Sequence, residues 1–400
     1  MQIDEPSSAI LPAPLWRLAF RAGFLAAGSF AVIGMLRWLY WMHVPSAWGP
    51  GLSPQWWHAH EMIFGFAMPV VAGFLLTAVA TWTGTTGTRG LRLQVLFGLW
   101  LLARTLLWFA TEGLPAAALW LAWAAEMAFL GLLAYELGKR VLAVRQWRNV
   151  LFLPVLLALA SFNTAAYLET DDPARSTALY YAAIWMITLL VTIVGGRVIP
   201  LFTGNRLGLK IAPLPDWLEY AALFCIAAVG LLSASSAVQP FDGAFRLLCL
   251  VGGLLHFYRL AHWRGWQTTR VPLLWSMHLS YLCIPLSLLA LAIAGDDPVA
   301  IKNVIHLLGI GCIGGMILAM MARVSLGHTG RPLETPWYIA VAFAMVLLAA
   351  LLRAALPQLA PELTMWSWRL SAGLWIAAFA LFLYRYLPIL SRARADGKPG

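Results

Sequence analysis

Histidine side chains are the residues of this sequence most able to do chemistry, because an imidazole can bind a metal ion or carry a proton near neutral pH. The chain has eight histidines. Several of them interrupt long apolar segments, where a polar ring is costly unless it is paired and therefore points to function. The candidates for binding a metal or a cofactor are His58, His60, His278, His306 and His328.

Two of these histidines are separated by one residue and are followed by an acidic residue, Glu61. On a regular helix His58 shares a face with Glu61 and Met62, whereas His60 points about 160° away from His58. One metal ion therefore cannot bind both rings on a regular helix. We expect one histidine to be an axial ligand facing the bundle, and the other to accompany Glu61 as an orienting group or in a copper-type site. A hydrogen-bonded histidine pair at the membrane interface is the alternative.

His306 is followed closely by four glycines, Gly309, Gly311, Gly314 and Gly315. A glycine inside a helix costs about 1 kcal/mol relative to alanine, so the group needs a cause. Close packing between helices is one cause. The other is a flat macrocycle that lies against the helix with its iron bound to His306.

A second layer of candidates lies toward the opposite ends of the apolar segments. His278 lies about one turn inside its segment, near Tyr281, and His328 lies in a polar loop rich in glycine. Arg197 and Arg323 are expected at a similar depth, where they could bind heme propionates or another anion. The alternative is that both arginines only mark the cytoplasmic face.

These side chains need a scaffold that holds them inside a membrane. Of the 400 residues, 61% are apolar and 11% are charged, whereas about a quarter of the residues in a soluble domain are charged. At about 20 residues per span, the sequence predicts an all-α polytopic protein with about twelve transmembrane helices in a single membrane domain, residues 1–400. The spans are expected near 18–42, 59–82, 92–110, 115–138, 149–168, 177–200, 217–237, 242–262, 273–295, 299–322, 337–356 and 364–388.

The net charge of +10 is explained by orientation in the lipid bilayer. Most of the 27 basic residues fall in alternate connections and in the two tails. By the positive-inside rule this pattern places both termini in the cytoplasm. We therefore expect no nucleic-acid partner.

An internal triplication is suggested by a dipeptide that recurs at nearly equal intervals. Thr-Gly occurs at residues 83–84, 203–204 and 329–330, each time where an even-numbered span ends. The interval predicts repeats over 15–140, 141–262 and 263–390, arranged around a pseudo-threefold axis. It makes His60, Tyr180 and His306 equivalent. Regular loop lengths with basic residues on one side would produce a similar pattern without repeats.

Four blocks of the sequence resemble the signature of the NnrS family. They occur in order along nearly the whole chain: Trp57–Phe66 continuing to Gly84, Gly195–Thr203, His278–Tyr281 and Ser325–Pro332. One position departs from the family pattern, because Ser280 stands where a glycine is expected.

The resemblance implies a bacterial inner-membrane protein that binds heme b, and also copper. It further implies a role in denitrification and in resistance to nitric oxide and nitrosative stress. We expect a heme protein that binds or handles nitric oxide. One alternative is a nitric oxide reductase-like oxidoreductase with heme and a second metal, in which Glu61 is the candidate catalytic group; the other is a transporter of a small molecule or metal complex. The sequence does not indicate the electron donor.

Overall fold

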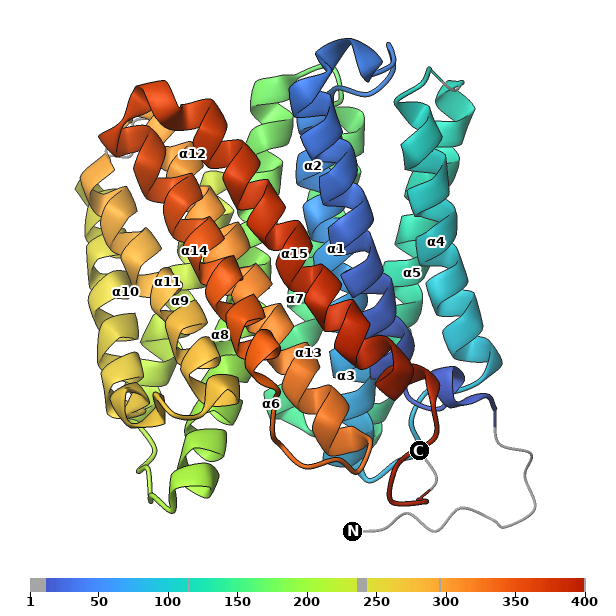
Figure 1. Ribbon diagram of the computed structural model, residues 1–400, viewed down its shortest axis with the longest axis vertical. Helices are drawn as coiled ribbons and strands as arrows, with labels where there is room; N and C mark the ends of the chain where they lie inside the picture. Colours follow the sequence, from blue (N-terminus) through green and yellow to red (C-terminus); the bar gives the residue numbers. More distant parts are fainter. Residues whose placement is uncertain (1–11, 114, 236–242, 295, 399–400) are drawn as a thin grey trace. The chain divides into compact units, whose positions relative to one another are not determined.

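The computed structural model describes residues 12–398 except 114, 236–242 and 295, and every regular element in these residues is helical. Twelve helical stretches are long and apolar enough to cross a membrane, so all twelve predicted spans are confirmed and the protein is a multi-pass membrane protein. The helices that build them (Figure 1) are α1 (Ala19–His43), α2 (Pro54–His60) with α3 (Met68–Thr83), α4 (Leu91–Ala110), α5 (Ala116–Ala143), α6 (Trp147–Val150) with α7 (Phe152–Leu168), α8 (Pro173–Leu207), α9 (Asp216–Ser233), α10 (Gly243–His262), α11 (Pro272–Ala294), α12 (Pro298–His306) with α13 (Gly315–His328), α14 (Trp337–Leu359) and α15 (Thr364–Ser391).

The second, sixth and tenth spans begin in the same way. Each starts with a proline at the first helical position, and the residue before it caps the helix: Ser53, Asp172 and Asp297 accept hydrogen bonds from main-chain N–H groups of the first turn. This combination satisfies N–H groups that the helix leaves open, and the proline has no N–H to satisfy. These are the three spans that the predicted triplication makes equivalent. The repeat arrangement itself stays a prediction.

Two of these spans contain a π-helical segment. Glu61–Ala67 joins α2 to α3, and Leu307–Gly314 joins α12 to α13. The first segment begins directly after His60 and the second directly after His306. π-Helical turns are rare and are often found at functional sites, because they alter the direction of the side chains around them.

The chain forms two compact units. Unit 1 contains the described residues of Met1–Thr164 and of Phe382–Gly400, together with Arg323–Leu333; unit 2 contains the described residues of Ala165–Ala322 and Glu334–Leu381. Helices α7, α13 and α15 therefore contribute residues to both units. Each candidate site described below lies within one unit.

Candidate functional site

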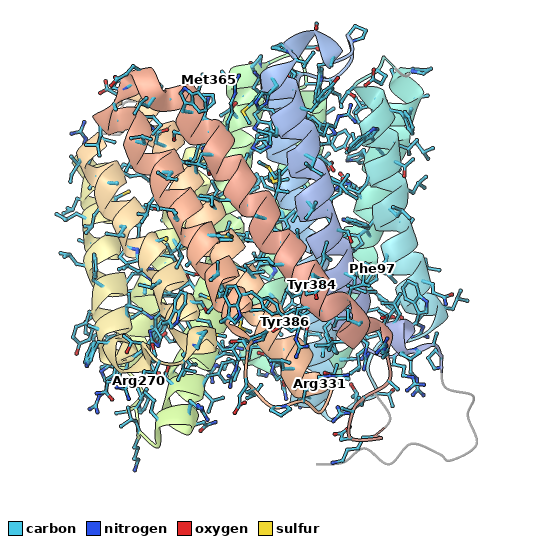
Figure 2. All side chains as sticks on the ribbon, in the orientation of Figure 1. Phe97, Arg270, Arg331, Met365, Tyr384 and Tyr386 are labelled. Atoms are coloured by element: carbon cyan, nitrogen blue, oxygen red, sulfur yellow. The ribbon has the colours of Figure 1, made fainter. Side chains whose placement is uncertain are left out.

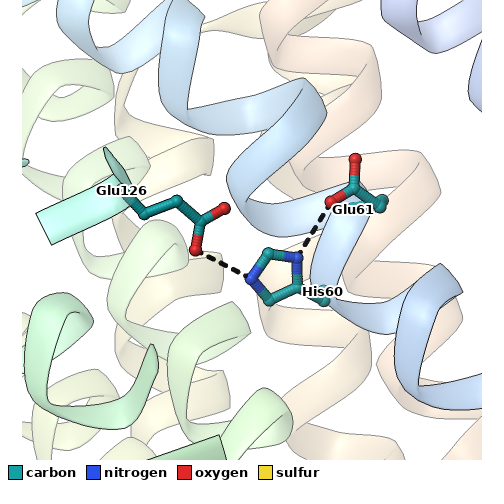
Figure 3. A group of neighbouring side chains, drawn as sticks. All are labelled: His60, Glu61 and Glu126. Atoms are coloured by element: carbon teal, nitrogen blue, oxygen red, sulfur yellow. Dashed lines mark hydrogen bonds and ion pairs between the residues drawn. The ribbon is translucent and has the colours of Figure 1, made fainter. Parts of the chain in front are cut away.

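The most deeply buried charged cluster of unit 1 is centred on His60, at the end of α2. One ring nitrogen, Nδ1, lies 3.0 Å from Glu61 Oε1, and the other, Nε2, lies 3.1 Å from Glu126 Oε2 (Figure 3). Nε2 also lies 3.0 Å from Asn163 Oδ1. The rings of His60 and Trp56 stack with their centroids 4.8 Å apart. Both His60 and Glu61 are fully buried.

Arg104 completes this cluster, which we call the His60 network: His60, Glu61, Arg104, Glu126 and Asn163. The guanidinium of Arg104, on α4, pairs with Glu126, on α5, and its Nε lies 3.4 Å from Glu61 Oε2. Asn163, on α7, donates a hydrogen bond from Nδ2 to Glu126 Oε2 at 2.7 Å. The network thus joins four spans of unit 1 through buried ion pairs.

The hydrogen-bond geometry of the His60 network calls for one additional proton. Both imidazole nitrogens face oxygen atoms that accept hydrogen bonds, because a carboxylate has no donor and the Asn163 amide N–H group already points at Glu126. Either the ring of His60 carries a proton on each nitrogen, or one carboxyl group is protonated. In both cases two negative carboxylates, one guanidinium and one additional proton give a neutral cluster. Such a cluster can transfer a proton between its members without exposing a charge to lipid.

A single metal ion could also reach three groups of this network. The nearest ligand atoms of His60, Glu61 and Glu126 lie within 4.8 Å of one another. One nitrogen and two carboxylate oxygens form a harder ligand set than Cu(I) prefers. The guanidinium of Arg104 already contacts both carboxylates, so a divalent ion would have to displace it. We therefore interpret the cluster primarily as a proton-carrying network.

Of the two histidines, the one that contacts Glu61 in the structure is His60. His58 stacks on Trp38 of α1, with ring centroids 4.0 Å apart, while Glu61 contacts His60. The π-helical segment that begins at Glu61 removes the regular spacing on which the expectation rested. The prediction that the two rings cannot bind one ion is consistent with these separate surroundings.

His306 is held by hydrogen bonds within unit 2. Its Nδ1 donates to the carbonyl of Lys302 at 2.7 Å, and Arg353 Nη2 lies 3.4 Å from its Nε2. Two of the following glycines are required by close helix packing. A Cβ atom at Gly311 would lie 2.6 Å from Cys283 Sγ, and one at Gly314 would overlap the ring of Trp375. Side chains thus fill the space at these two glycines that the macrocycle interpretation assigned to a ring.

His278 lies at the wall of a cavity of about 540 Å³ in unit 2. The cavity is formed by α10, by the connection that follows it and by α11. Its lining is largely apolar and includes Phe257, Leu260, Gly265, Trp266, Trp275 and His278. The volume lies within the range of pockets that bind drug-sized ligands or cofactors. We call this cavity the His278 pocket.

The two ring nitrogens of His278 differ in their partners. Nε2 lies 3.0 Å from Thr203 Oγ1, on α8. Nδ1 is buried and has no hydrogen-bond partner. A Cβ atom at Gly265 would lie only 2.6 Å from Nδ1, so the absence of a side chain there makes room for the ring. When Nε2–H donates to Thr203, Nδ1 carries a lone pair with no donor, as in a histidine oriented to bind a metal.

Comparison with known proteins decides the family. The family model for the NnrS protein matches residues 14–394, nearly the whole chain. The chain belongs to the NnrS family. No curated protein shows a match to the chain.

The NnrS blocks recognised in the sequence contain the two clusters that the structure builds. The first block, Trp57–Phe66, supplies His60 and Glu61 to the His60 network. Two further blocks meet in the His278 pocket, because Thr203 of one is hydrogen-bonded to His278 of the other. Ser280, the position that departs from the family pattern, faces Gly315, where a Cβ atom would overlap the serine hydroxyl.

Tyr281 of this NnrS protein belongs to a buried polar network of its own. Its hydroxyl lies 2.8 Å from His256 Nδ1 and accepts a hydrogen bond from Arg259. Arg259 in turn pairs with Glu219 at 2.6 Å. His256 is fully buried, and Tyr281 and the carbonyl of Ala222 satisfy its ring inside the bundle.

Replacing Tyr281 with phenylalanine is expected to destabilise the protein by about 1–3 kcal/mol, because it leaves buried groups of His256 and Arg259 without a partner. The thermal midpoint of the purified protein measures this change. If Tyr281 contacts a cofactor instead, the same variant will alter the absorption spectrum of the bound cofactor and change the thermal midpoint little.

The remaining predicted residues are His328, Arg197 and Arg323. The ring centroid of His328 lies 5.5 Å from that of Phe20 in unit 1, and Arg394 donates to the His328 carbonyl at 2.9 Å. Hydrogen bonds from Arg394 lower the pKa of Asp396 below its usual value. Arg197 lies half-buried in unit 2 and Arg323 half-buried in unit 1. Their role in binding propionates stays a prediction.

Sequence reasoning missed Arg104, Glu126 and Asn163. All three are polar residues inside predicted spans, and the rule that selected the histidines would have selected them as well. It also missed Thr203 as a partner of His278, although the Thr-Gly repeat had marked that position. Spacing alone could not show that these residues from different spans meet.

Proposed function

We propose that this protein is a heme b protein of the bacterial inner membrane that binds nitric oxide and protects the cell against nitrosative stress. Membership of the NnrS family supports a role in nitric oxide stress or denitrification. The basic residues of alternate connections support an orientation with both termini in the cytoplasm. The observation that carries the heme assignment is His278, which lines an apolar cavity and whose buried Nδ1 atom has no hydrogen-bond partner.

The His278 pocket has the chemistry that a heme requires. Its aromatic and aliphatic lining suits the porphyrin, and an imidazole is a common protein ligand of heme iron. Arg264 and Arg270 are exposed residues of the connection between α10 and α11, the segment that also contains Gly265 and Trp266 (Figure 2). They would offer positive charge to propionates at the membrane surface. The bound heme would supply an iron atom on which nitric oxide can coordinate.

The chain's own residues would orient the iron ligand and exclude water. Thr203 holds one nitrogen of His278 and so fixes the direction of the other. Trp266 and Trp275 cover the pocket with apolar surface. An apolar, partly enclosed site favours the binding of a small uncharged gas and shields it from reactions in water.

Protection of cells tests the proposed function. A host that lacks its own nitric oxide detoxification, carrying this protein or an empty vector, is exposed to a nitric oxide donor under low oxygen. We expect the protein to shorten the growth lag, together with a heme b signal in the reduced-minus-oxidised difference spectrum of the membranes. Membranes that contain the protein without additional heme, or cells with an unchanged lag, would contradict the proposal.

A second candidate function is reduction of nitric oxide, and the His60 network is the observation that favours it. Reduction to nitrous oxide consumes protons and electrons, and this network can hold and deliver a proton. We expect no nitrous oxide above that formed by free heme with a chemical reductant. Catalytic formation of nitrous oxide that is lost in Glu126→Gln would replace the binding proposal with the enzymatic one. Copper binding stays a prediction from the family resemblance.

A further inference from the structure

A cluster of positive charge in unit 2 has no carboxylate partner. Arg353, near the end of α14, has a 5% exposed surface, and its guanidinium carbon lies 4.6 Å from the ring centroid of Trp368. The ammonium group of Lys302, on α12, lies 5.0 Å from the same centroid. Among the residues that the structure describes, no carboxylate lies within ion-pair distance of either cation. Trp368 belongs to the second turn of α15, close to Met365 (Figure 2).

Three other buried arginines, Arg104, Arg140 and Arg259, each pair with a glutamate. The side-chain partners of Arg353 are neutral acceptors, Asn303 Oδ1 and His306 Nε2. A cation buried in protein costs several kcal/mol unless it is compensated. The face of one tryptophan stabilises a desolvated cation by about 2 kcal/mol. One ring shared by two cations, together with neutral hydrogen-bond acceptors, therefore leaves the positive charge of Arg353 without an opposite charge.

The same cluster has more hydrogen-bond donors than acceptors. Arg353 Nη1 donates to Asn303 Oδ1 at 2.8 Å, and this contact fixes which way the amide points. Asn303 Nδ2 is consequently left without a partner, although the residue is 97% buried. The indole Nε1 of Trp368 is also buried without a partner. The lone pair of His306 Nε2 faces Arg353 and is not available to the other donors.

We propose that Lys302, Asn303, Arg353 and Trp368 form a binding site for a small oxyanion of the size and charge of nitrite or nitrate. A planar oxyanion supplies both features that the cluster lacks, a negative charge and several acceptor oxygens. It can accept paired hydrogen bonds from a guanidinium and further bonds from amide and indole N–H groups. The burial of Arg353 favours a small ion over a bulky headgroup, and the exposed side chain of Lys302 provides a route of entry. This site is independent of the heme proposal.

Thermal stabilisation of the purified protein in a neutral detergent tests the site. The thermal midpoint is recorded while sodium nitrate, sodium nitrite or sodium phosphate replaces sodium gluconate at constant ionic strength. A ligand that binds only the folded protein raises its stability with ligand concentration. We expect a saturable rise of the midpoint with nitrate or nitrite that is lost in Arg353→Gln and retained in Arg206→Gln, a variant of an exposed arginine.

Two further variants separate anion binding from a structural role. Trp368→Phe keeps the ring face but removes the indole N–H. We expect this variant to need at least threefold more nitrate for the half-maximal rise of the midpoint. Asn303→Asp places a carboxylate beside the guanidinium of Arg353, and we expect a higher midpoint in gluconate with no further rise in nitrate. A midpoint of the wild-type protein that does not respond to any of the three anions would overturn the proposal. A response only to added phosphatidylglycerol would also overturn it, in favour of a headgroup site.

Discussion

Protein carrying His278→Ala is expected to contain at least tenfold less heme than the wild-type protein when both are purified from the same host. The alanine removes the one imidazole that lines the His278 pocket, and the apolar lining that remains offers no strong iron ligand. The heme content per protein, measured as the pyridine hemochrome, gives the result directly. Elution as a single species in gel filtration shows that the variant is folded.

The matched control for this variant is His262→Ala. His262 lies at the end of α10, close in sequence to the pocket, and its Nε2 donates to the carbonyl of Ala212 at 2.7 Å. We expect its heme content to equal that of the wild-type protein. Wild-type heme content in His278→Ala would place the heme elsewhere, and His60→Ala and His306→Ala would then be measured in the same way.

Removing the group that orients His278 should have a smaller effect. Thr203→Val keeps the shape of the side chain but removes the hydroxyl that lies against Nε2. Loss of such an orienting partner commonly weakens metal binding by about 10–100-fold. We expect the Thr203→Val protein to lose its heme to added apomyoglobin more readily than the wild-type protein does. Unchanged retention would show that Thr203 does not orient the ligand.

The second large effect is expected from Arg104→Gln, which should destabilise the protein by about 3–5 kcal/mol. This is the cost observed when one partner of a buried ion pair is removed and the other is left uncompensated. Here the glutamine would leave both Glu61 and Glu126 without their cation. A fall in the thermal midpoint and in the yield of folded protein from membranes measures the effect, with Arg206→Gln as the exposed control.

A double variant tests whether the charge balance causes this loss of stability. Arg104→Gln combined with Glu126→Gln removes one charge of each sign, so we expect it to be more stable than Arg104→Gln alone. His60 and Asn163 retain hydrogen-bonding partners in this variant. If the double variant is less stable than the wild-type protein by the sum of the two single effects, the charges are not coupled and the proton-carrying network is wrong.

The twelve spans could be predicted because a membrane helix is recognised from local properties. Each span is a run of apolar residues of the right length, bounded by proline, glycine or charge, and no contact with another span is needed to find it. The sixth span was predicted to end at residue 200 and instead continues to Leu207. Pro200 marked the expected end, but α8 continues through it.

The clusters could be predicted only in part, because they depend on how helices face one another. The sequence indicated His60 and Glu61 as candidates, but a regular helix puts Glu61 on the face of His58 and left open which histidine accompanies it. The π-helical segment at Glu61–Ala67 has no simple local signal, and it changes the direction of the side chains that follow. Likewise, His278 was a candidate by its depth, whereas its partner Thr203 lies on another span, 75 residues away in the sequence.

We propose that heme in this protein binds nitric oxide, and an anaerobic titration of the purified protein is the direct test of this binding. The purified, heme-loaded protein is reduced, nitric oxide is added in steps, and the absorption spectrum is recorded. We predict a saturable shift of the Soret band that is complete at about one nitric oxide per heme and that is absent in His278→Ala. A Soret band that stays unchanged in the presence of excess nitric oxide would contradict the account.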